Sequence, residues 1–430
     1  MASYLRDART VFLANAASAM AGLLTQAVLA WFLLPAGRGE FAACILFATL
    51  LTLAFALGQE MANVYFVGSK QITPSEAFSQ SLFAAVFTSG LACLVGFALT
   101  QTDLSFLDKA PRELFRWSLL CIPAAIFHLY LSRILLGLSA MGQFTFVTAA
   151  PAILEAVGIL VAARAGLDVK TALLLQAATN AAGAILAAFL LVNRHGCRLV
   201  SLHWSQLLRS IGYGARFYLG KLCSMANVQL GSIILAFAAV ERSELGLFAA
   251  ASAMASRLWM VSESLQVAML PRSAADPAGQ SRLIAQVTRL CLALSLAITV
   301  LVLLFSRPLI ALILSPRFLP VLLPFQLLLP GVVIRVIPKI LVAYFNGINR
   351  PGINSWAMGI TAALNIGLMV LLLPRWGLSG VAVSMSTAYA LEAAILGVAF
   401  CRLSGVRAAE LLLPERNDWE AIRRTLRGNS

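Results

Sequence analysis

Long apolar segments follow one another along almost the whole chain. They are runs of about 20 residues, separated by short stretches with charged residues, proline or glycine, and a helix of this length crosses the hydrocarbon core of a bilayer. The pattern predicts an all-α integral membrane protein with about twelve transmembrane helices. The predicted spans are residues 10–33, 39–62, 77–100, 114–136, 143–163, 169–193, 211–237, 245–270, 284–305, 319–345, 353–373 and 378–401.

The first apolar run, VFLANAASAMAGLLTQAVLAWFLL, follows Arg6 and Arg9. It is longer than the hydrophobic region of a signal peptide, and no clear cleavage site follows it. We therefore expect this segment to remain in the protein as its first transmembrane helix.

The composition agrees with a membrane protein and excludes several other classes. Of the 430 residues, 60% are hydrophobic and 12% are charged, and the mean hydropathy is +0.87. A soluble protein of this length needs more charge to cover its surface. The net charge is +14, but the cations lie singly between apolar runs, so we expect no nucleic-acid partner. The seven cysteines are scattered without metal-ligand spacing, so we expect neither a metal site nor a disulfide framework.

The distribution of basic residues predicts the orientation in the membrane. An even number of spans places both termini on the same side. A cytoplasmic N-terminus puts sixteen Lys and Arg residues in cytoplasmic segments and ten in outer segments, which is the bias of the positive-inside rule. We therefore expect both termini in the cytoplasm.

The two halves of the chain resemble each other, with a polar connection between them at residues 193–209. Short motifs recur at nearly one offset, and each lies at the end of a predicted helix. They are RGEFAA (38–43) with LGLFAA (245–250) at an offset of 207, Gly137 and Gly142 with Gly347 and Gly352 at 210, and RAGL (164–167) with RWGL (375–378) at 211. Six helices per half give both repeats the same orientation, and transporters built in this way bind their substrate between the halves.

The repeat predicts three regions of the chain. An N-terminal lobe of six helices occupies residues 1–200, a C-terminal lobe of six helices occupies 201–402, and a cytoplasmic tail occupies 403–430. In the tail, Trp419 and Leu426 fall on one helical face beside several arginines, as in an amphipathic helix on an anionic leaflet. A solvated tail without such a helix stays open as the alternative.

Ionisable residues inside the predicted spans are the most informative feature, because each costs about 2.5–3.5 kcal/mol near the middle of a membrane. They are Glu60, Arg133, Glu155, Arg216, Lys221, Arg257, Glu263, Arg335, Lys339 and Glu392. Five of the six cations belong to the second half. Two explanations stay open: ion pairs that stabilise the fold, such as Arg257 with Glu263 or Glu392, and a cationic cavity for an anionic substrate.

The segment VIRVIPKILVAYFNGINRPG (333–352) carries the clearest pair of cations. Arg335 and Lys339 are four residues apart and therefore lie on one face of a helix. Pro338 lacks the backbone N–H that would bond the Ile334 carbonyl, which favours a kink there. A kinked helix with two cations on one face suits the binding of phosphate.

The first predicted helix adds uncharged polar groups at helical spacing, which include Asn15, Thr25 and Gln26. They suit hydrogen bonds to sugar hydroxyls, and close packing between helices explains them equally well. The chain has no Walker A motif and no catalytic constellation of side chains. We therefore expect no enzyme activity, and transport driven by an ion gradient, the membrane potential or the substrate gradient.

Two segments of the second half resemble a known family of transporters. ELGLFAAASAMASRLWMVSESLQVAMLPRSA (244–274) is similar to helix eight of polysaccharide flippases, with a Gly-aromatic-Ala start and a Leu-Pro exit. Segment 328–387 is similar to their C-terminal block, with Leu-Pro-Gly at 329–331, a loop with Gly347 and Pro351, Asn365 in the next helix, and a turn with Pro374 and Gly377. These motifs resemble the Wzx-type polysaccharide and O-antigen flippases of the multidrug/oligosaccharidyl-lipid/polysaccharide (MOP) exporter superfamily.

The resemblance implies a MATE-like fold of two six-helix lobes and transport by alternating access. The implied function is that of a flippase in the bacterial inner membrane. It moves an undecaprenyl-diphosphate-linked oligosaccharide from the cytoplasmic to the periplasmic leaflet, for the biosynthesis of O-antigen, capsule or exopolysaccharide. The implied partners are this lipid-linked substrate and membrane lipids, with polysaccharide polymerase or assembly proteins as further candidates.

We therefore predict a cavity that binds the diphosphate and sugar groups. Its predicted residues are Arg216, Lys221, Arg257, Arg335, Lys339, Asn15 and Gln26. Two alternatives stay open: a MATE-like multidrug exporter, and a scaffold of a polysaccharide assembly complex that transports nothing. The candidates for ion coupling by H⁺ or Na⁺ are Glu60, Glu155 and Glu263, and no other cofactor is expected.

Overall fold

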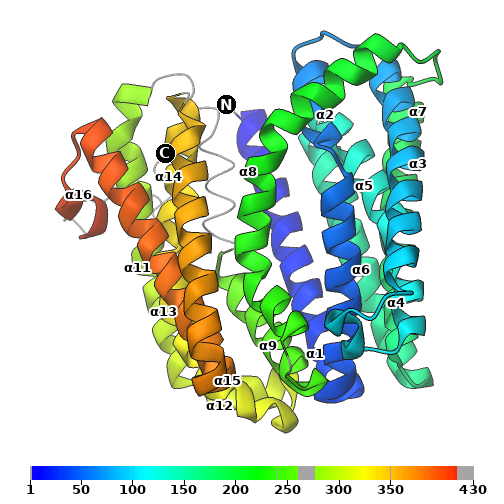
Figure 1. The fold of residues 1–430 in the computed structure, drawn as a ribbon. Helices are drawn as coiled ribbons and strands as arrows, with labels where there is room; N and C mark the ends of the chain where they lie inside the picture. Colours follow the sequence, from blue (N-terminus) through cyan, green and yellow to red (C-terminus); the bar gives the residue numbers. More distant parts are fainter. Residues whose placement is uncertain (1, 239, 260–276, 349, 414–430) are drawn as a thin grey trace. The chain divides into compact units, whose positions relative to one another are not determined.

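The computed structural model describes residues 2–238, 240–259, 277–348 and 350–413 of the chain. Within these residues the side chains of 2–15, 216–227, 277–280, 343, 346, 347 and 351 are not described. The described chain consists of helices with short connections and has no strand in these ranges, so the predicted all-α fold is confirmed (Figure 1).

Each predicted span overlaps helix in the described part of the chain, while residues 260–270 of the eighth span lie outside the described residues. Two pairs of spans are joined into long kinked helices. Helix α1 (Ala2–Phe55) bends at Leu34, with φ 61° and ψ 174°, and α15 (Pro351–Ser404) bends at Gly377, with φ 55° and ψ −135°. Eight helices in the described residues are long and apolar enough to cross a membrane, and the two kinked helices are among them.

Arg38 follows the first predicted span, and it lies in a helix rather than in a connecting loop. Pro35 and Gly37 were expected to end the first helix, but only Leu34 leaves the helical conformation and the chain is helical again from Pro35. Proline is tolerated in the first turn of a helix, because its missing N–H has no intrahelical partner there. Arg38 therefore lies within α1, and it is 4% exposed.

The described chain divides into two compact units. Unit 1 consists of Met1–Leu222 and Ser232–Ala250, and unit 2 of Cys223–Gly231 and Ala251–Ser430. The predicted lobe boundary at residues 200 and 201 stays a prediction. The units are described one at a time below.

Unit 1 is a bundle of antiparallel helices joined by short turns. Beside α1 its elements are α2 (Gln59–Gly68), α3 (Pro74–Leu99), the 3₁₀ helix η1 (Ser105–Lys109), α4 (Arg112–Ser118), α5 (Cys121–Gly137), α6 (Met141–Ala165), α7 (Val169–His195), most of α8 (Trp204–Phe237) and the start of α9 (Arg242–Ser256). Helix α5 packs against α2, α3 and α7, and α1 packs along α6 (Figure 1).

The helix ends in unit 1 follow from local sequence. Thr73 and Glu76 form a capping box at the start of α3, since the Thr73 hydroxyl accepts from the Glu76 N–H and the Glu76 carboxylate accepts from the Thr73 N–H. Asp168 caps α7 by accepting a hydrogen bond from the Thr171 N–H at 2.9 Å. Gly166 and Gly196, both with positive φ, end α6 and α7.

The repeated motifs RGEFAA and LGLFAA lie against each other in unit 1. A Cβ added to Gly246 would lie 2.6 Å from the backbone nitrogen of Gly39, and one added to Gly39 would lie 2.7 Å from the carbonyl carbon of Arg242. Arg242 Nη1 also bonds Glu40 Oε1 at 2.8 Å. The backbones of α1 and α9 can approach this closely only because both positions are glycine.

Unit 2 contains the end of α9, η2 (Arg257–Trp259) and the helices of the second half. They are α11 (Pro277–Leu304), α12 (Ser306–Leu309), the π-helical turn η3 (Ile310–Leu314), η4 (Pro316–Val321), α13 (Leu322–Ile334), α14 (Val336–Gly347), α15 and α16 (Ala408–Leu412). Helix α15 packs against α13 and α14, and α11 packs against α14 (Figure 1).

The predicted tail begins inside the packed part of unit 2. Helix α15 continues to Ser404, and Val406 and Leu411 are buried in a core cluster with residues of α11, α14 and α15. The predicted amphipathic segment around Trp419 lies outside the described residues.

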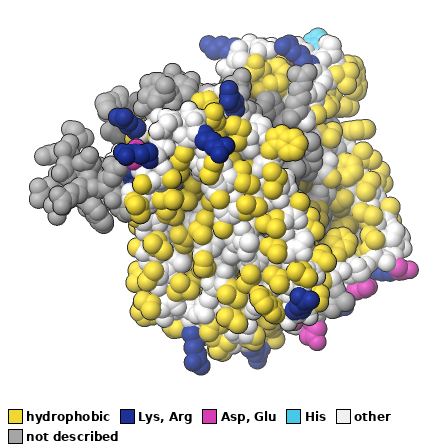
Figure 2. Space-filling model, turned by 60° about the vertical axis from the view of Figure 1, so that its left-hand side comes forward, with side chains coloured by type: hydrophobic (Ala, Val, Ile, Leu, Met, Phe, Trp, Pro, Cys, Tyr) yellow, Lys and Arg dark blue, Asp and Glu magenta, His cyan; other side chains and the backbone are white. Residues whose placement is uncertain are grey.

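The surface has the character expected of a protein in lipid. Large side chains such as Phe87, Leu94, Val161 and Ile185 in unit 1, and Leu312 and Val370 in unit 2, are exposed. The face turned forward in Figure 2 is mostly hydrophobic, and its Lys and Arg side chains lie near opposite edges. Such a face is costly in water and favourable in a bilayer.

Candidate functional site

Arg335 lies at a break between two helices of unit 2. It is the C-terminal cap of α13, and α14 begins at the next residue. Its N–H donates to the Gly331 carbonyl at 3.0 Å, and its own carbonyl accepts from the Lys339 N–H at 3.3 Å. Pro338 supplies no N–H for the Ile334 carbonyl, which accounts for the predicted break at this position.

The guanidinium of Arg335 faces two aromatic rings. Its Cζ atom is 4.1 Å from the ring centroid of Tyr389 and 5.1 Å from that of Trp259. The two rings are 6.0 Å apart and nearly perpendicular, at 76°. Trp259 is fixed in turn by a hydrogen bond from its Nε1 to the Val332 carbonyl at 2.9 Å. Aromatic faces stabilise a desolvated cation without neutralising its charge.

Lys339 joins the same group of side chains. Its Nζ atom lies 4.6 Å from the ring centroid of Trp259, and the side chain is half-buried. Arg335 and Lys339 therefore share one aromatic residue, as their spacing of four along the helix allows. The predicted cation pair is formed in the structure.

Glu392 provides a counter-charge for Arg335. Its Oε2 lies 3.7 Å from Arg335 Nε, and the two side chains are 2% and 4% exposed. This distance is an ion pair rather than a hydrogen bond. Arg335 Nη1 and Glu392 Oε2 are buried without a hydrogen-bond partner among the described residues. We call Arg335, Lys339, Glu392, Trp259 and Tyr389 the cation cluster.

The cation cluster combines charged and aromatic side chains. It holds two cations and one carboxylate, and its aromatic rings are neutral. A third predicted cation, Arg257, begins the short helix η2 that ends at Trp259, and it is half-buried. The buried Nη1 of Arg335 is costly unless an anion or another polar group accepts a hydrogen bond from it.

Other predicted site residues are placed elsewhere or lie outside the description. The side chains of Asn15, Arg216 and Lys221 are not described, and Glu263 lies outside the described residues. Their predicted roles stay predictions.

In unit 1, Gln26 accepts a hydrogen bond from the guanidinium of Arg38 across the kink of α1. The side-chain oxygen of Gln26 is therefore already used as an acceptor within the protein. Arg38 adds a buried cation to α1. Arg38 Nε is buried without a hydrogen-bond partner among the described residues, and its Cζ lies 5.2 Å from the Phe41 ring. Glu155 of α6 is half-buried in the same unit.

Glu60 lies in the first turn of α2 and is fully buried. Its neighbours Gln59 and Asn63 continue a buried polar network, in which Asn63 Nδ2 donates to Ser81 Oγ at 2.8 Å and to the Tyr130 carbonyl at 3.1 Å. This network joins α2, α3 and α5. It gives Glu60 a polar setting in the bundle interior.

Three members of the cation cluster were not predicted as site residues. Trp259 and Tyr389 were passed over because an aromatic residue in an apolar run is usually a packing residue. Glu392 was considered as an ion-pair partner of Arg257, but in the structure its ion pair is with Arg335. The spacing of Tyr389 and Glu392, three residues apart on α15, is the signal that could have paired them.

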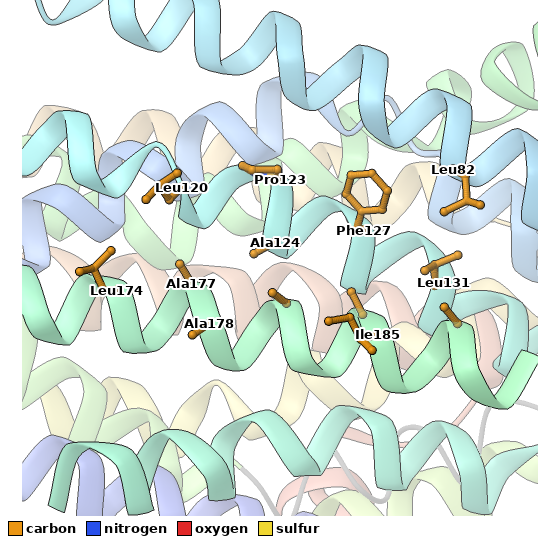
Figure 3. A pocket seen from close by; sticks show the side chains of 13 residues that line it. Leu82, Leu120, Pro123, Ala124, Phe127, Leu131, Leu174, Ala177, Ala178 and Ile185 are labelled. Carbon is orange, nitrogen blue, oxygen red and sulfur yellow. The ribbon is translucent and has the colours of Figure 1, made fainter. Parts of the chain in front are cut away.

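A separate apolar pocket lies in unit 1 between α3, α5 and α7 (Figure 3). It has a volume of about 570 Å³ and is lined by Leu82, Leu120, Pro123, Ala124, Phe127, Leu131, Leu174, Ala177, Ala178, Ala181, Ala184, Ile185 and Ala188. Since none of these side chains is polar, the pocket suits hydrocarbon and has no group for a phosphate or an ion.

The described residues contain no group of three or more His, Cys, Asp or Glu side chains that could hold a metal ion. The candidate chemistry of the described chain is therefore electrostatic. It consists of buried cations, aromatic faces and buried carboxylates.

The fold is similar to that of solved membrane transporters. The lipid II flippase MurJ in an inward closed conformation matches with a TM-score of 0.75 and 13% identity, over 98% of this chain and 93% of that chain. A mutant of the Vibrio cholerae MATE transporter VcmN matches with a TM-score of 0.60 and 14% identity, over 94% and 99%. The eukaryotic MATE transporter AtDTX14 matches with 0.60 and 15%, over 98% and 99%.

No protein-family model matches this chain, and no curated protein matches it in sequence. At 13–15% identity the structural matches show the fold. The predicted all-α, MATE-like membrane fold is thereby confirmed.

Proposed function

We propose that this chain is a flippase for a lipid-linked saccharide. In this proposal it moves an undecaprenyl-diphosphate-linked oligosaccharide from the cytoplasmic to the periplasmic leaflet of a bacterial inner membrane, by alternating access. The oligosaccharide is a precursor of a surface polysaccharide such as O-antigen, capsule or exopolysaccharide. Both termini lie in the cytoplasm, and the partners are the lipid-linked substrate, membrane lipids and polysaccharide polymerase or assembly proteins.

The observation that carries the proposal is the pair of cations in the cation cluster. Arg335 and Lys339 face one tryptophan, with Glu392 as the carboxylate of the cluster. Aromatic faces hold the two cations in place without neutralising their charge. Guanidinium and ammonium groups at such spacing match the oxygens of a diphosphate better than they match a cationic drug.

The structural similarities support the proposal at the level of fold. MurJ is named as a lipid II flippase, and the present chain matches it over 98% of its own length. A fold that accommodates a lipid-linked cargo in one protein is a reasonable framework for another. The apolar surface of the chain is consistent with a prenyl tail that stays in the lipid while the head group crosses.

Reconstitution into liposomes tests the proposal. A fluorescent prenyl-diphosphate sugar is placed in both leaflets, and the fraction accessible to an impermeant quencher or enzyme is followed over time. We expect Arg335→Ala with Lys339→Ala to slow flipping about tenfold or more, since each charge-assisted hydrogen bond contributes about 1.5–3 kcal/mol. The exposed Arg375 of α15 provides the matched control, and Arg375→Ala should flip at the rate of the original chain.

A second pair of variants separates binding from folding. Removing Arg335 alone leaves Glu392 buried without its cation, which destabilises the unit whatever the substrate is. Arg335→Gln together with Glu392→Gln removes both charges and avoids this effect. If that double variant folds and still flips the diphosphate lipid at the original rate, the proposed function is wrong.

A cation-coupled multidrug exporter is the second candidate. The observation that favours it is the full burial of Glu60, which follows Gln59 of a buried polar network in unit 1. An intramembrane carboxylate of this kind is suited to carry a proton or Na⁺. Efflux of cationic dyes that depends on Glu60, with no flipping of diphosphate lipids, would support the exporter and contradict the flippase.

A further inference from the structure

We infer that the connection between α7 and α8 binds the head groups of anionic phospholipids at the membrane surface. The α7–α8 connection consists of residues 193–209, and all of it belongs to unit 1. Such a lipid site is independent of the cargo that the chain transports.

Hydrogen bonds hold the α7–α8 connection against the start of α3. The Arg198 N–H donates to Ser75 Oγ at 3.2 Å. The Val200 N–H donates to Ser79 Oγ, one turn further along α3, at 2.9 Å. The non-helical residues 196–203 therefore follow the first turns of α3.

Trp204 lies on the lipid-facing side of α3. Its ring packs edge-on against Phe83, with 5.4 Å between the ring centroids, and the side chain is 60% exposed. Phe83 is eight residues beyond Ser75, which is about 12 Å along a helix. The next turn of α3 exposes Val86 and Phe87, as a surface that faces lipid does. Tryptophan at such a position is typical of the interface between head groups and hydrocarbon.

The outer side of the α7–α8 connection combines apolar and basic side chains. Leu199 is 74% exposed and Leu208 is 66% exposed, whereas Cys197 and Leu207 are buried. The first turns of α8 cross the end of unit 1 at which α3 begins (Figure 1). Exposed apolar side chains beside arginines are typical of a segment that lies in the head-group region of a bilayer.

The same end of unit 1 has a strong excess of positive charge. Its exposed cations are Lys70, Arg194, Arg198 and Arg209. Hydrogen bonds bring together the turns 69–80, 138–143 and 193–209 of the described chain, and these turns contain one carboxylate. It belongs to Glu76, which already forms the capping box of α3.

An anionic phospholipid fits both features of this surface. Guanidinium and ammonium groups bind phosphate oxygens, and each Lys or Arg near an anionic leaflet raises the affinity about fivefold. An acidic protein would also meet the cations. The exposed leucines and Trp204, however, continue the apolar surface of α3, and a lipid leaflet covers that surface as well.

Tryptophan quenching in lipid nanodiscs tests this inference on the full chain. The bilayer is phosphatidylcholine, and part of it is replaced by phosphatidylglycerol or phosphatidylcholine that is brominated on its acyl chains. Subtracting the signal of Trp204→Phe isolates Trp204 from the other tryptophans. We expect brominated phosphatidylglycerol to quench Trp204 as strongly as brominated phosphatidylcholine at about five times its mole fraction.

Charge variants assign the lipid preference to the α7–α8 connection. Arg194→Gln with Arg198→Gln should remove most of the preference for phosphatidylglycerol, and salt at about 0.5 M should weaken it in the original chain. The matched control is Arg307→Gln with Arg317→Gln, which removes two exposed arginines of unit 2 and should leave the preference unchanged.

Three results would overturn the inference and leave the proposed function standing. The first is equal quenching of Trp204 by the two brominated lipids in the original chain. The second is a preference for phosphatidylglycerol that survives the loss of Arg194 and Arg198. The third is no quenching by either lipid, which would place Trp204 in water or against a protein partner.

Discussion

Gly39 of α1 and Gly246 of α9 meet backbone to backbone in unit 1. A Cβ on Gly246 would lie 2.6 Å from the Gly39 nitrogen, a separation that no real side chain tolerates. The two glycines occupy equivalent places in the repeated motifs RGEFAA and LGLFAA, 207 residues apart. The contact therefore brings two matching motifs of the sequence repeat together within unit 1.

Gly39→Ala is expected to destabilise unit 1. The added methyl group would overlap the backbone of Arg242, which cannot move as a flexible side chain does. Overpacking of this kind costs about 1–3 kcal/mol. Thermal unfolding of the purified protein in detergent measures the change.

Gly142→Ala is the matched control for this substitution. Gly142 is exposed in the first turn of α6, and an added Cβ meets nothing within 4 Å. Alanine at such a position is neutral or gains up to about 1 kcal/mol. Equal unfolding temperatures for the two variants would mean that the α1–α9 contact is not close in solution.

Arg335→Met is expected to destabilise unit 2 because it leaves the Glu392 carboxylate buried without its cation. Breaking a buried pair from one side costs about 3–5 kcal/mol. The double variant Arg335→Met, Glu392→Gln removes both charges, and its loss should be smaller than the sum of the two single losses. Denaturant titrations of the four proteins give the coupling between the residues.

The result that would contradict this prediction is simple additivity. If the losses of the two single variants add up to that of the double variant, the 3.7 Å pair contributes no coupling energy. Arg407→Met with Glu410→Gln is a useful comparison, since that pair is exposed and its coupling should be below about 1 kcal/mol.

The helical architecture could be predicted because the bilayer fixes both the length and the composition of a spanning helix. The break at Arg335 could be predicted as well, since Pro338 removes one backbone donor at a known place. By contrast, the sharp bend at Leu34 is set by the unusual backbone conformation of this one residue. A leucine side chain gives no indication of such a conformation in the sequence. The sequence pattern therefore did not show that the helix continues past Leu34 to Arg38.

The partners of Arg335 could not be predicted for a different reason. Trp259 and Glu392 come from segments far from Arg335 in the chain, and any of several acids could have paired with it. Cation–π contacts and ion pairs depend on which helices are neighbours. Apolar runs of similar length do not indicate which helices pack against each other. The cations of a membrane site can be found from sequence, whereas their partners need the packing of the helices.

Asp168 should make the stability of unit 1 depend on pH below about 4. Hydrogen bonds from Thr171, through its side chain and its N–H, lower the pKa of Asp168 below its usual value. A carboxylate with a lowered pKa adds stability above its unfolded pKa of about 3.9, and this stability is lost as the pH falls through the folded pKa. Unfolding temperatures measured between pH 3 and 7, a range of about four pH units around that value, report the loss.

Two variants test the role of Asp168 at the start of α7. Asp168→Asn keeps an acceptor for the Thr171 N–H, so it should remain near the original stability at pH 7 and lose the acid dependence. Asp168→Ala should lose about 0.5–2 kcal/mol at pH 7. An acid dependence that is unchanged in Asp168→Asn would assign it to another carboxylate.

Lys109 is expected to hold the connection between α8 and α9. Its side chain is buried, and Nζ donates to the carbonyls of Ala238, at 2.7 Å, and Val240. Lys109→Met leaves both carbonyls without that donor, and each unsatisfied buried group costs about 1–3 kcal/mol. Amide hydrogen exchange in 105–109 and at Val240 should therefore become faster, while exchange in the interior of α5 stays unchanged, because the loss is local.

Lys70→Met, at an exposed lysine of the same unit, should leave all of these rates as they are. Equal exchange in both variants would show that water takes the place of the Lys109 amine at the two carbonyls.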